Sequence, residues 1–461
     1  MKKLLFGFKL YYLIYLLLAF NAYINESKFM SYATLFLSAA GVLVFLFLAV
    51  QIKNYKNMCN IRLNVIFIGS YVLSSVCMFR YGFSNNGKEC VWLLLTMVVL
   101  YASSYCYTAD EMKREFRFLS AVMVAYSTIV NAVSISMVTW GREFGVSFHV
   151  DGVEGYKVIG FKWGRLWGLY DDPNHGATIA VAAVFLTMYL IQSAGKKWLK
   201  AVWMMTLAIQ FAYIVLSDSR TGLVALGVGV CIWTAYLWYV RGRRQNIAAG
   251  KALGTGLLLG ILLAAVLTGA AYECKQQYNT VDKKLEAAWQ KKNKKPVKKP
   301  SGQLGRKKDL VQDASNGRID IWKSGLEIAK TSPVYGVSFR NMTGYAQEKL
   351  PETYLVKNGE GVKYDSLHNS VMDILVSQGI VGIVILLLII GNTVRLIRNK
   401  LPDIKEENRD VLLGCFSVIA AMGTGSMFLS IVFYLNAPQT YIFWLCFGYF
   451  VTILQKEGRT G

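Results

Sequence analysis

Residues 369–394 read NSVMDILVSQGIVGIVILLLIIGNTV, an apolar run in which Asp373 is the only charged side chain. Roughly 20 consecutive apolar residues are enough to cross the hydrocarbon core of a bilayer. The next residues, 395–400, read RLIRNK and are strongly basic, as is typical of a cytoplasmic helix end. The stretch therefore predicts a transmembrane helix that enters from the outer side near His368.

The composition of the whole chain agrees with a membrane protein. Its 461 residues are 54% hydrophobic and only 17% charged, where a soluble domain has about 25% charged residues. The mean hydropathy is +0.37. The pattern recurs about twelve times, in the approximate ranges Leu10–Ile24, Ser31–Gln51, Ile61–Met78, Cys90–Tyr107, Phe118–Trp140, Ala177–Ala194, Ala201–Leu216, Gly222–Val240, Ala252–Ala271, Asn369–Val394, Val411–Leu435 and Thr440–Leu454. Lys2, Lys3 and Lys9 precede the first run, and no small-residue cleavage site follows it, so we expect a retained helix rather than a signal peptide.

The basic residues predict the orientation. Lysine and arginine concentrate in every second connection, and the positive-inside rule places these connections in the cytoplasm. The basic connections are residues 53–62, 113–117, 196–200, 241–251 and 395–409. Both termini are therefore expected inside. Much of the net charge of +22 is explained by topology and does not indicate nucleic-acid binding.

We expect an all-α integral membrane protein in four parts. Residues 1–140 would form transmembrane helices 1–5, and residues 141–272 an outer loop with helices 6–9. Residues 273–367 would form a large extracytoplasmic loop that contains short helices, and residues 368–461 helices 10–12. Outer loops of this length are usually functional in a compact protein.

The large loop has two parts. Lys283–Asp309 is strongly basic, which favours a solvated, partly disordered segment over a guide for anionic lipid or polymer. In the following stretch, Ile319, Trp322, Leu326 and Ala329 recur at helical spacing. This spacing predicts an amphipathic helix capped by Ser315 or Asn316 and ended by Ser332-Pro333.

Four outer-face residues could carry chemistry: Arg165, Arg220, Arg318 and His368. The planar arginine fork binds phosphate oxygens in pairs and keeps its charge, although a surface position or snorkelling would also explain each arginine. Histidine suits proton transfer near neutral pH. His368 could equally be a helix-entrance residue beside a capping Asn369. Rival bases are His175, Asp171 and Asp172.

The sequence lacks the motifs of nucleotide-hydrolysing enzymes, zinc proteases and serine hydrolases. The chain has no Walker loop, no HExxH, no GxSxG and no dense acidic metal cluster. The energy for a reaction would have to come with the substrate. A lipid diphosphate-linked sugar meets this need, because the diphosphate is a good leaving group and the lipid lies in the bilayer.

Four stretches carry a family resemblance. LYDDPNHGA, LSDSRTGLVAL, NGRIDIWKSGLEIAKTSPVYG and LHNSVMDILVSQGIVG resemble, in this order, the motifs of the O-antigen ligase and O-antigen polymerase superfamily. The similarity covers roughly Arg165 to Leu388. It implies an inverting glycosyltransferase of the GT-C type that takes a glycan from undecaprenyl diphosphate on the outer face of the cytoplasmic membrane. It also implies that no metal, nucleotide sugar or other cofactor is needed.

The resemblance assigns roles to residues. Arg220 and Arg318 would bind the diphosphate and stabilise the leaving group, and His368 would deprotonate or orient the acceptor hydroxyl. The expected substrate-binding residues are Arg165, Asp172, Asn174, His175 and Asn369. The expected partners are the lipid-linked donor, a glycan or lipid acceptor, membrane lipids, and polysaccharide export and assembly proteins, without nucleic acid.

Polymerase and ligase share these motifs and differ in the acceptor. The divergent outer loops slightly favour a polymerase for capsule, exopolysaccharide or O-antigen. The alternative from another class is a polysaccharide or lipid transporter or flippase, which should show deep charges and internal repeats. A non-catalytic scaffold for polysaccharide assembly is the third interpretation.

Overall fold

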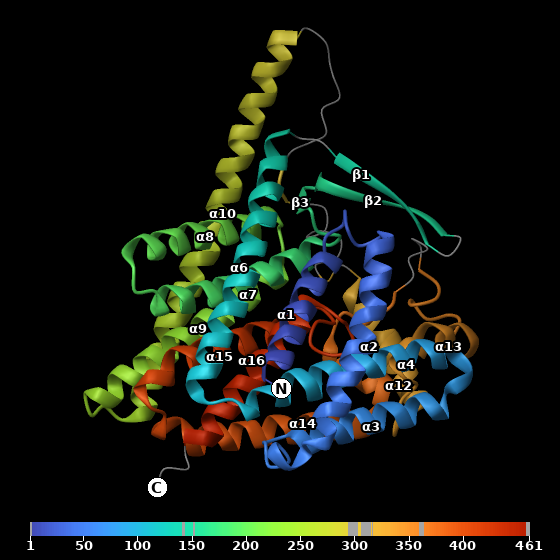
Figure 1. The fold of residues 1–461 in the computed structure, drawn as a ribbon. Helices are drawn as coiled ribbons and strands as arrows, with labels where there is room; N and C mark the ends of the chain where they lie inside the picture. Colours follow the sequence, from blue (N-terminus) through green and yellow to red (C-terminus); the bar gives the residue numbers. More distant parts are fainter. Residues whose placement is uncertain are drawn as a thin grey trace.

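The computed structural model of the protein describes residues 2–140, 143–150, 153–293, 303–305, 315, 317–358 and 364–457. These residues form a bundle of helices with a small sheet beside one end (Figure 1). The main elements are α1 (Lys2–Ala19), α2 (Lys28–Val50), α3 (Ile61–Cys77), α4 (Phe83–Leu94), η3 (Leu95–Leu100), α5 (Tyr101–Ser103), η4 (Ser104–Cys106), α6 (Ala109–Trp140), β1 (Glu143–Val150), β2 (Val153–Lys162), β3 (Arg165–Gly168), α7 (Pro173–Ser193), α8 (Lys197–Leu216), α9 (Arg220–Arg244), α10 (Ala249–Asn293), α12 (Arg318–Thr331), η5 (Phe339–Asn341), α13 (Met342–Lys349), α14 (Ser370–Lys400), α15 (Arg409–Gly425) and α16 (Pro438–Glu457).

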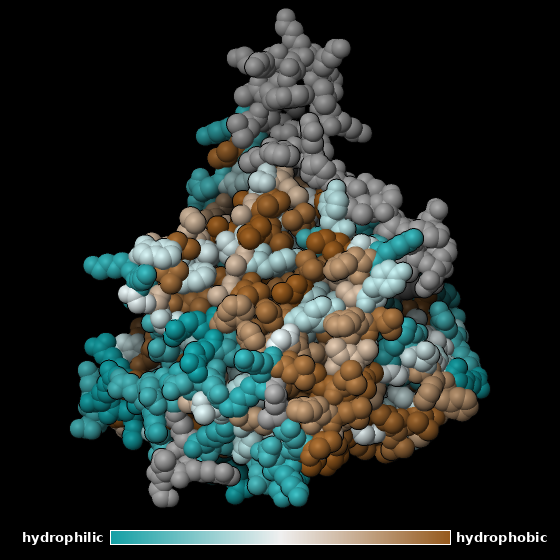
Figure 2. Space-filling model, viewed as in Figure 1, coloured by the Kyte–Doolittle hydropathy of each residue, from teal (hydrophilic) through white to brown (hydrophobic). Residues whose placement is uncertain are grey.

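Each apolar run found in the sequence overlaps a helix. Within the described residues, eight helices are long and apolar enough to cross a membrane. Figure 2 shows the matching surface, a hydrophobic band that crosses the molecule obliquely with hydrophilic residues at its lower left. The chain is therefore a mainly helical membrane protein, as predicted, and the higher count of about twelve spans stays a prediction.

Segments predicted to lie on one side of the membrane contact one another. On the predicted inner side, Lys2 pairs with Glu111 at 2.7 Å, and the Lys456 ammonium donates to the Tyr107 carbonyl at 2.5 Å. On the predicted outer side, an isolated antiparallel bridge joins Asn21 to Tyr170. These contacts fit a single alternation of sides along the chain.

The predicted outer loop after α6 contains a three-stranded antiparallel sheet in the order β1-β2-β3. Figure 1 shows the β1–β2 ribbon at the upper right of the bundle, and β2 and β3 contact α6. The sheet packs against α6 at Gly168, which has a left-handed φ of +65°. A Cβ atom at this position would lie 2.1 Å from the Ser134 Oγ of α6, so only glycine fits. These strands were not predicted from the sequence, although polar residues and glycine alternate in β1 with the apolar residues Phe144, Val146, Phe148 and Val150.

Helix α14 is interrupted at Gly379, where φ is +59° and ψ is −154°. A Cβ atom there would lie 2.4 Å from the Val334 backbone, so glycine lets the outer segment approach the helix. The Ile380 amide donates to the Pro333 carbonyl at 2.8 Å. The Val376 carbonyl accepts from the Val337 amide at 2.8 Å. Backbone groups released by the break are thus paired inside the protein, as a membrane interior requires.

The predicted span Val411–Leu435 is wrong in its second half. Helix α15 ends at Gly425, and residues 426–437 form an irregular, mostly buried segment before α16 begins at Pro438. The amide of Gln378 donates to the Tyr434 hydroxyl at 2.6 Å, which ties this segment to the break in α14. An apolar composition alone could not separate a buried irregular segment from a helix.

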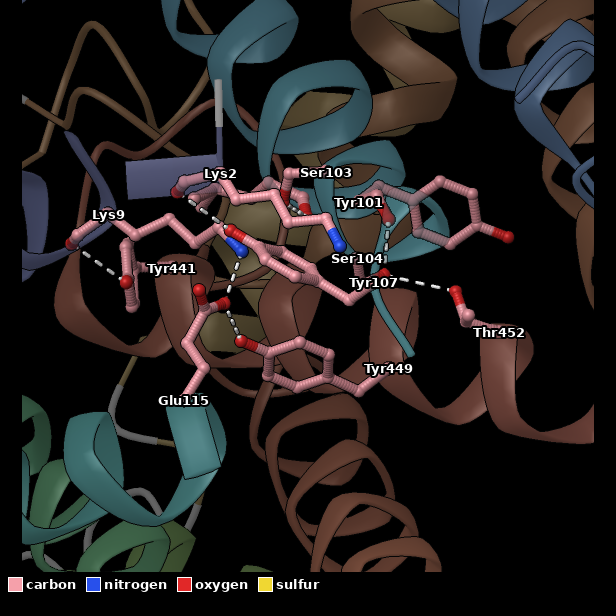
Figure 3. Close-up of polar contacts among 11 residues, drawn as sticks. Lys2, Lys9, Tyr101, Ser103, Ser104, Tyr107, Glu115, Tyr441, Tyr449 and Thr452 are labelled. Carbon is pink, nitrogen blue, oxygen red and sulfur yellow. Dashed lines mark hydrogen bonds and ion pairs between the residues drawn. The ribbon is translucent and has the colours of Figure 1, made fainter. Parts of the chain in front are cut away.

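A buried charged cluster joins α1, α6 and α16 (Figure 3). The Lys9 ammonium forms an ion pair with Glu115, which also accepts a hydrogen bond from the Tyr449 hydroxyl. The ammonium lies 4.7 Å from the Tyr107 ring centroid and 5.5 Å from that of Tyr449. Lys9 was expected to precede the first helix, but α1 begins at Lys2 and Lys9 is fully buried within it.

Candidate functional site

Arg220 is the first residue of α9 and follows a tight turn. The Ser219 hydroxyl accepts from the Gly222 amide at 3.1 Å and caps the helix. Asp218 has a left-handed backbone with φ of +49°, and its carboxylate pairs with Lys275 of α10. The turn thus presents the exposed Arg220 beside the positive end of a helix, where anions are favoured.

Arg165 holds the turn that precedes Arg220 through two hydrogen bonds. It is only 7% exposed, and its Nε donates to the Ser217 carbonyl at 2.8 Å. Its Nη2 donates to the Asn174 Oδ1 at 2.7 Å, which also accepts from the Ser219 hydroxyl at 3.0 Å. Arg165 and Asn174, both expected to contact substrate, therefore hold the backbone that presents Arg220.

Arg318 opens α12, which confirms the predicted helix. Ile319 and Leu326 of the predicted apolar stripe are exposed, however, and the buried face contains Ile321 and Ile328. The N-cap is Gly317 with φ of +77°, rather than Ser315 or Asn316, and Asn316 lies outside the described residues. The helix ends at Thr331, directly before Ser332 as predicted. Glycine suits the cap because the left-handed backbone strains other residues.

Arg220 and Arg318 line one cavity of about 280 Å³. Its other lining residues are Thr221, Val224, Ser315, Ile319, Trp322 and Phe428. Two cations from separate segments thus meet one apolar wall. A ligand with an anionic group next to a hydrocarbon chain matches this combination.

His368 is held in a left-handed backbone, with φ of +52°. The amide of the preceding Leu367 donates to Asp373 Oδ1 at 2.8 Å, and its carbonyl accepts from Trp322 Nε1 at 3.0 Å. Asn369 caps α14 as predicted, with its Oδ1 accepting from the Val371 and Met372 amides at 3.0 and 3.2 Å. Several buried contacts therefore fix the backbone of His368.

The surroundings of His368 disfavour its charged form. Its pKa is lowered from 6.5 to about 4, chiefly by burial and then by the positive charge of Arg318, with a smaller contribution from His175, while Asp172 opposes the shift. The Tyr364 ring stands edge-on to the imidazole, with ring centroids 6.3 Å apart. The imidazole is consequently neutral at pH 7 and able to accept a proton.

The start of α7 contributes Asp172 and His175 to this region. Asp172 caps the helix, with Oδ1 accepting from the Asn174 and His175 amides at 2.6 and 3.2 Å. Gln439 donates to the His175 carbonyl at 3.0 Å and lies 3.4 Å from its Nδ1. The pKa of Asp171 is raised by burial, although Lys157 opposes the shift from 3.6 Å. His175 is thus held by Gln439, whereas the negative charge of Asp172 raises the pKa of His368.

Three contributors were not expected from the sequence. Phe428 comes from the irregular segment after α15, Lys275 from the part of α10 beyond the predicted span, and the half-buried Trp322 from α12. Asp373, which accepts a hydrogen bond from the Leu367 amide beside His368, could have been noticed in the sequence, because it is the lone acidic residue in an apolar run. Within the described ranges, no cluster of three histidine, cysteine or carboxylate side chains could hold a metal ion.

The comparison with protein families agrees with this arrangement. Residues 205–387 match the family model described as O-antigen ligase. The resemblance to the O-antigen ligase and polymerase superfamily is confirmed over this segment, which includes Arg220, Arg318 and His368. Arg165 and the start of α7 lie before it. No curated protein matches the chain.

Proposed function

We propose that the protein is a membrane glycosyltransferase that takes glycan repeat units from undecaprenyl diphosphate on the outer face of the cytoplasmic membrane. The O-antigen ligase family match supports ligase or polymerase chemistry in general. The observation that carries the specific proposal is the cavity in which Arg220 and Arg318 face an apolar wall.

The cavity fits the two halves of such a donor. The two guanidinium groups would bind diphosphate oxygens, and both lie in first turns of helices, where the helix dipole adds to the positive potential. Val224, Ile319 and Phe428 would contact the first isoprene units. Fixed positive charge would stabilise the negative charge that develops on the leaving diphosphate.

The proposed reaction is one displacement at the anomeric carbon. The acceptor hydroxyl oxygen forms the new bond, and the bond to the diphosphate oxygen breaks with its electron pair. The hydroxyl proton passes to the neutral imidazole of His368. Attack opposite the leaving group inverts the anomeric configuration.

Donor binding would also strengthen the base. Arg318 lowers the pKa of His368 through its positive charge. A bound diphosphate would neutralise that charge, so the pKa of His368 would rise towards the range useful for proton transfer. This coupling would keep the base weak until a donor is in place.

The acceptor decides between polymerase and ligase. A polymerase would extend a second lipid-linked glycan, whereas a ligase would transfer the glycan to a different lipid or protein. The decisive experiment incubates the purified protein with a lipid diphosphate-linked repeat unit and analyses the products. Longer lipid-linked chains mean polymerase, and transfer to a second acceptor means ligase. If the intact donor moved from one leaflet of a vesicle membrane to the other and no new glycosidic bond formed, the protein would be a flippase and the proposal would be overturned.

Site variants test the assignment of residues. Arg220→Ala and His368→Ala should each abolish product while the protein remains in the membrane, because one binds the leaving group and the other accepts the proton. Loss of one donor to a developing oxyanion alone lowers kcat by about 10²–10³-fold. Lys323→Gln is the matched control, since Lys323 is an exposed cation on α12 outside the cavity. Normal glycan from both site variants would refute the mechanism.

A further inference from the structure

A second cavity lies far from Arg220 and Arg318, between the start of α3 and the C-terminal half of α14. It measures about 510 Å³ and opens at the predicted cytoplasmic side. Its lining residues are Lys56, Asn57, Met58, Asn60, Arg62, Leu63, Ile66, Leu388 and Asn392. Helices α3 and α14 run side by side here, along the bottom of Figure 1. We call this feature the α3–α14 groove.

The groove has a fixed framework. Asn60 is buried and joins its two walls, with Nδ2 donating to Thr393 Oγ1 at 2.8 Å. The loop before α3 is tied to α16, because the Cys59 amide donates to Gln455 Oε1 at 2.9 Å. The Tyr101 hydroxyl donates to the Cys59 carbonyl at 2.6 Å. A binding surface on this loop would therefore be largely preformed.

Two cations and one buried oxygen atom of the groove have no partner among the described residues. Lys56 and Arg62 are exposed and form no ion pair with any residue in the described part of the chain. No side chain caps α3, so its first amides add positive potential beside these cations. The buried Asn60 Oδ1 has no hydrogen-bond partner among the described residues. This oxygen is too deeply buried to contact a ligand directly, so the amide that a ligand can reach is that of the exposed Asn392.

The apolar part of the groove faces the membrane. Ile66 is 53% exposed and Leu388 is 50% exposed, and both continue the groove along the helices. Asn392 is an exposed amide within the span of α14, where a polar side chain needs a partner other than hydrocarbon. Cations, amides and apolar side chains thus follow one another in the order of a headgroup, a glycerol backbone and acyl chains.

We propose that the α3–α14 groove binds an anionic glycerophospholipid whose headgroup carries a free hydroxyl, as in phosphatidylglycerol. Lys56 and Arg62 hold the phosphate. The headgroup hydroxyl donates to the side-chain oxygen of Asn392, and the acyl chains lie against Leu63, Ile66 and Leu388. A zwitterionic headgroup is disfavoured because its own cation would lie beside two protein cations.

Native mass spectrometry of the full chain in detergent tests this site. Phosphatidylglycerol, phosphatidylmethanol and phosphatidylcholine are titrated separately. Phosphatidylmethanol has the same charge as phosphatidylglycerol but no headgroup hydroxyl. The variant Lys56→Gln/Arg62→Gln should bind phosphatidylglycerol about 25-fold more weakly. The control Lys53→Gln/Lys251→Gln removes two exposed cations of the same side that lie outside the groove, and it should bind normally.

A second variant examines the hydroxyl. The wild-type protein should prefer phosphatidylglycerol over phosphatidylmethanol by about fivefold, the effect of one hydrogen bond, and Asn392→Leu should reduce this preference. Equal loss in the charge variant and its control would overturn the site. Equal binding of the two anionic lipids would overturn the hydroxyl contact, and full competition by soluble glycerol phosphate would overturn a lipid ligand.

Discussion

Asp373→Ala should impair catalysis without touching a reacting atom. Asp373 is buried in the first turn of α14, and its carboxyl accepts from the Leu367 amide at 2.8 Å and from the Ser430 hydroxyl. The Leu367 amide directly precedes His368, whose φ of +52° is strained for a residue other than glycine. Removing the carboxyl frees this strained backbone and leaves a buried amide without an acceptor.

The size of the effect follows from these contacts. A backbone in a sparsely populated region costs about 1–3 kcal/mol, and an unsatisfied buried amide costs roughly another 1–3 kcal/mol. Relaxation of the loop therefore becomes favourable, and 1.4 kcal/mol changes a population tenfold. We expect kcat to fall by about 10–100-fold, because a misplacement of 1 Å can lower a rate 10²-fold. The KM for the lipid-linked donor should change little, since Arg220 and Arg318 are untouched.

The assay follows product formation from a lipid diphosphate-linked repeat unit at varied donor concentration. Asp373→Asn should retain most activity, because its amide oxygen still accepts from the Leu367 amide. Asp365→Ala is the matched control, as Asp365 is an exposed carboxylate in the same segment. The double variant His368→Ala/Asp373→Ala should be no slower than His368→Ala alone. Independent, multiplying losses in the double variant would refute the positioning role.

Three further outcomes are expected. Arg165→Lys should lower kcat/KM by about tenfold, because lysine cannot reproduce the fork that holds the turn before α9; kinetics at wild-type level would contradict this. Imidazole NMR should show His368 titrating near pH 4, and activity should be lost as the pH falls through the pKa of His368 in the donor complex. Arg318→Gln or added pyrophosphate should move the titration of His368 to higher pH. An unchanged titration would show that the charge of Arg318 does not lower the pKa of His368. Glu115→Ala should lower the free energy of unfolding by about 3–5 kcal/mol by leaving Lys9 buried and unpaired, as measured by denaturation in detergent, whereas a neutral pair at both positions should recover much of the loss.

The sequence predicted what depends on composition and local pattern. Apolar runs located the helices, and helical spacing located α12 between Gly317 and Ser332. Asn369 caps α14, as the helix-entrance alternative for His368 anticipated, because this cap needs only neighbouring residues; its expected contact with substrate stays a prediction. Candidates at four separated positions could be chosen because arginine and histidine are conspicuous near apolar runs.

Contacts between distant segments could not be predicted from the sequence. The break at Gly379 depends on how the segment around Val334 packs, and Phe428 reaches the cavity only because α15 ends early. Arg165 was expected at the substrate, whereas its burial beneath the turn requires knowledge of Ser217 and Asn174 in space. Only the three-dimensional structure therefore distinguishes Arg220 and Arg318, which line the cavity, from Arg165, which holds the turn before α9 in place.

The buried pair of Lys9 and Glu115 has a consequence for how the chain enters the membrane. Its partners are 106 residues apart, so at about 5–20 residues per second the ribosome makes Glu115 roughly 5–20 s after Lys9. A lysine in a membrane helix without a partner is unfavourable by about 2.5–3.5 kcal/mol. We therefore expect α1 to stay at the insertion machinery or the lipid headgroups until α6 arrives. Tyr449 comes another 334 residues after Glu115, so the pair lacks this hydrogen bond until α16 has been made.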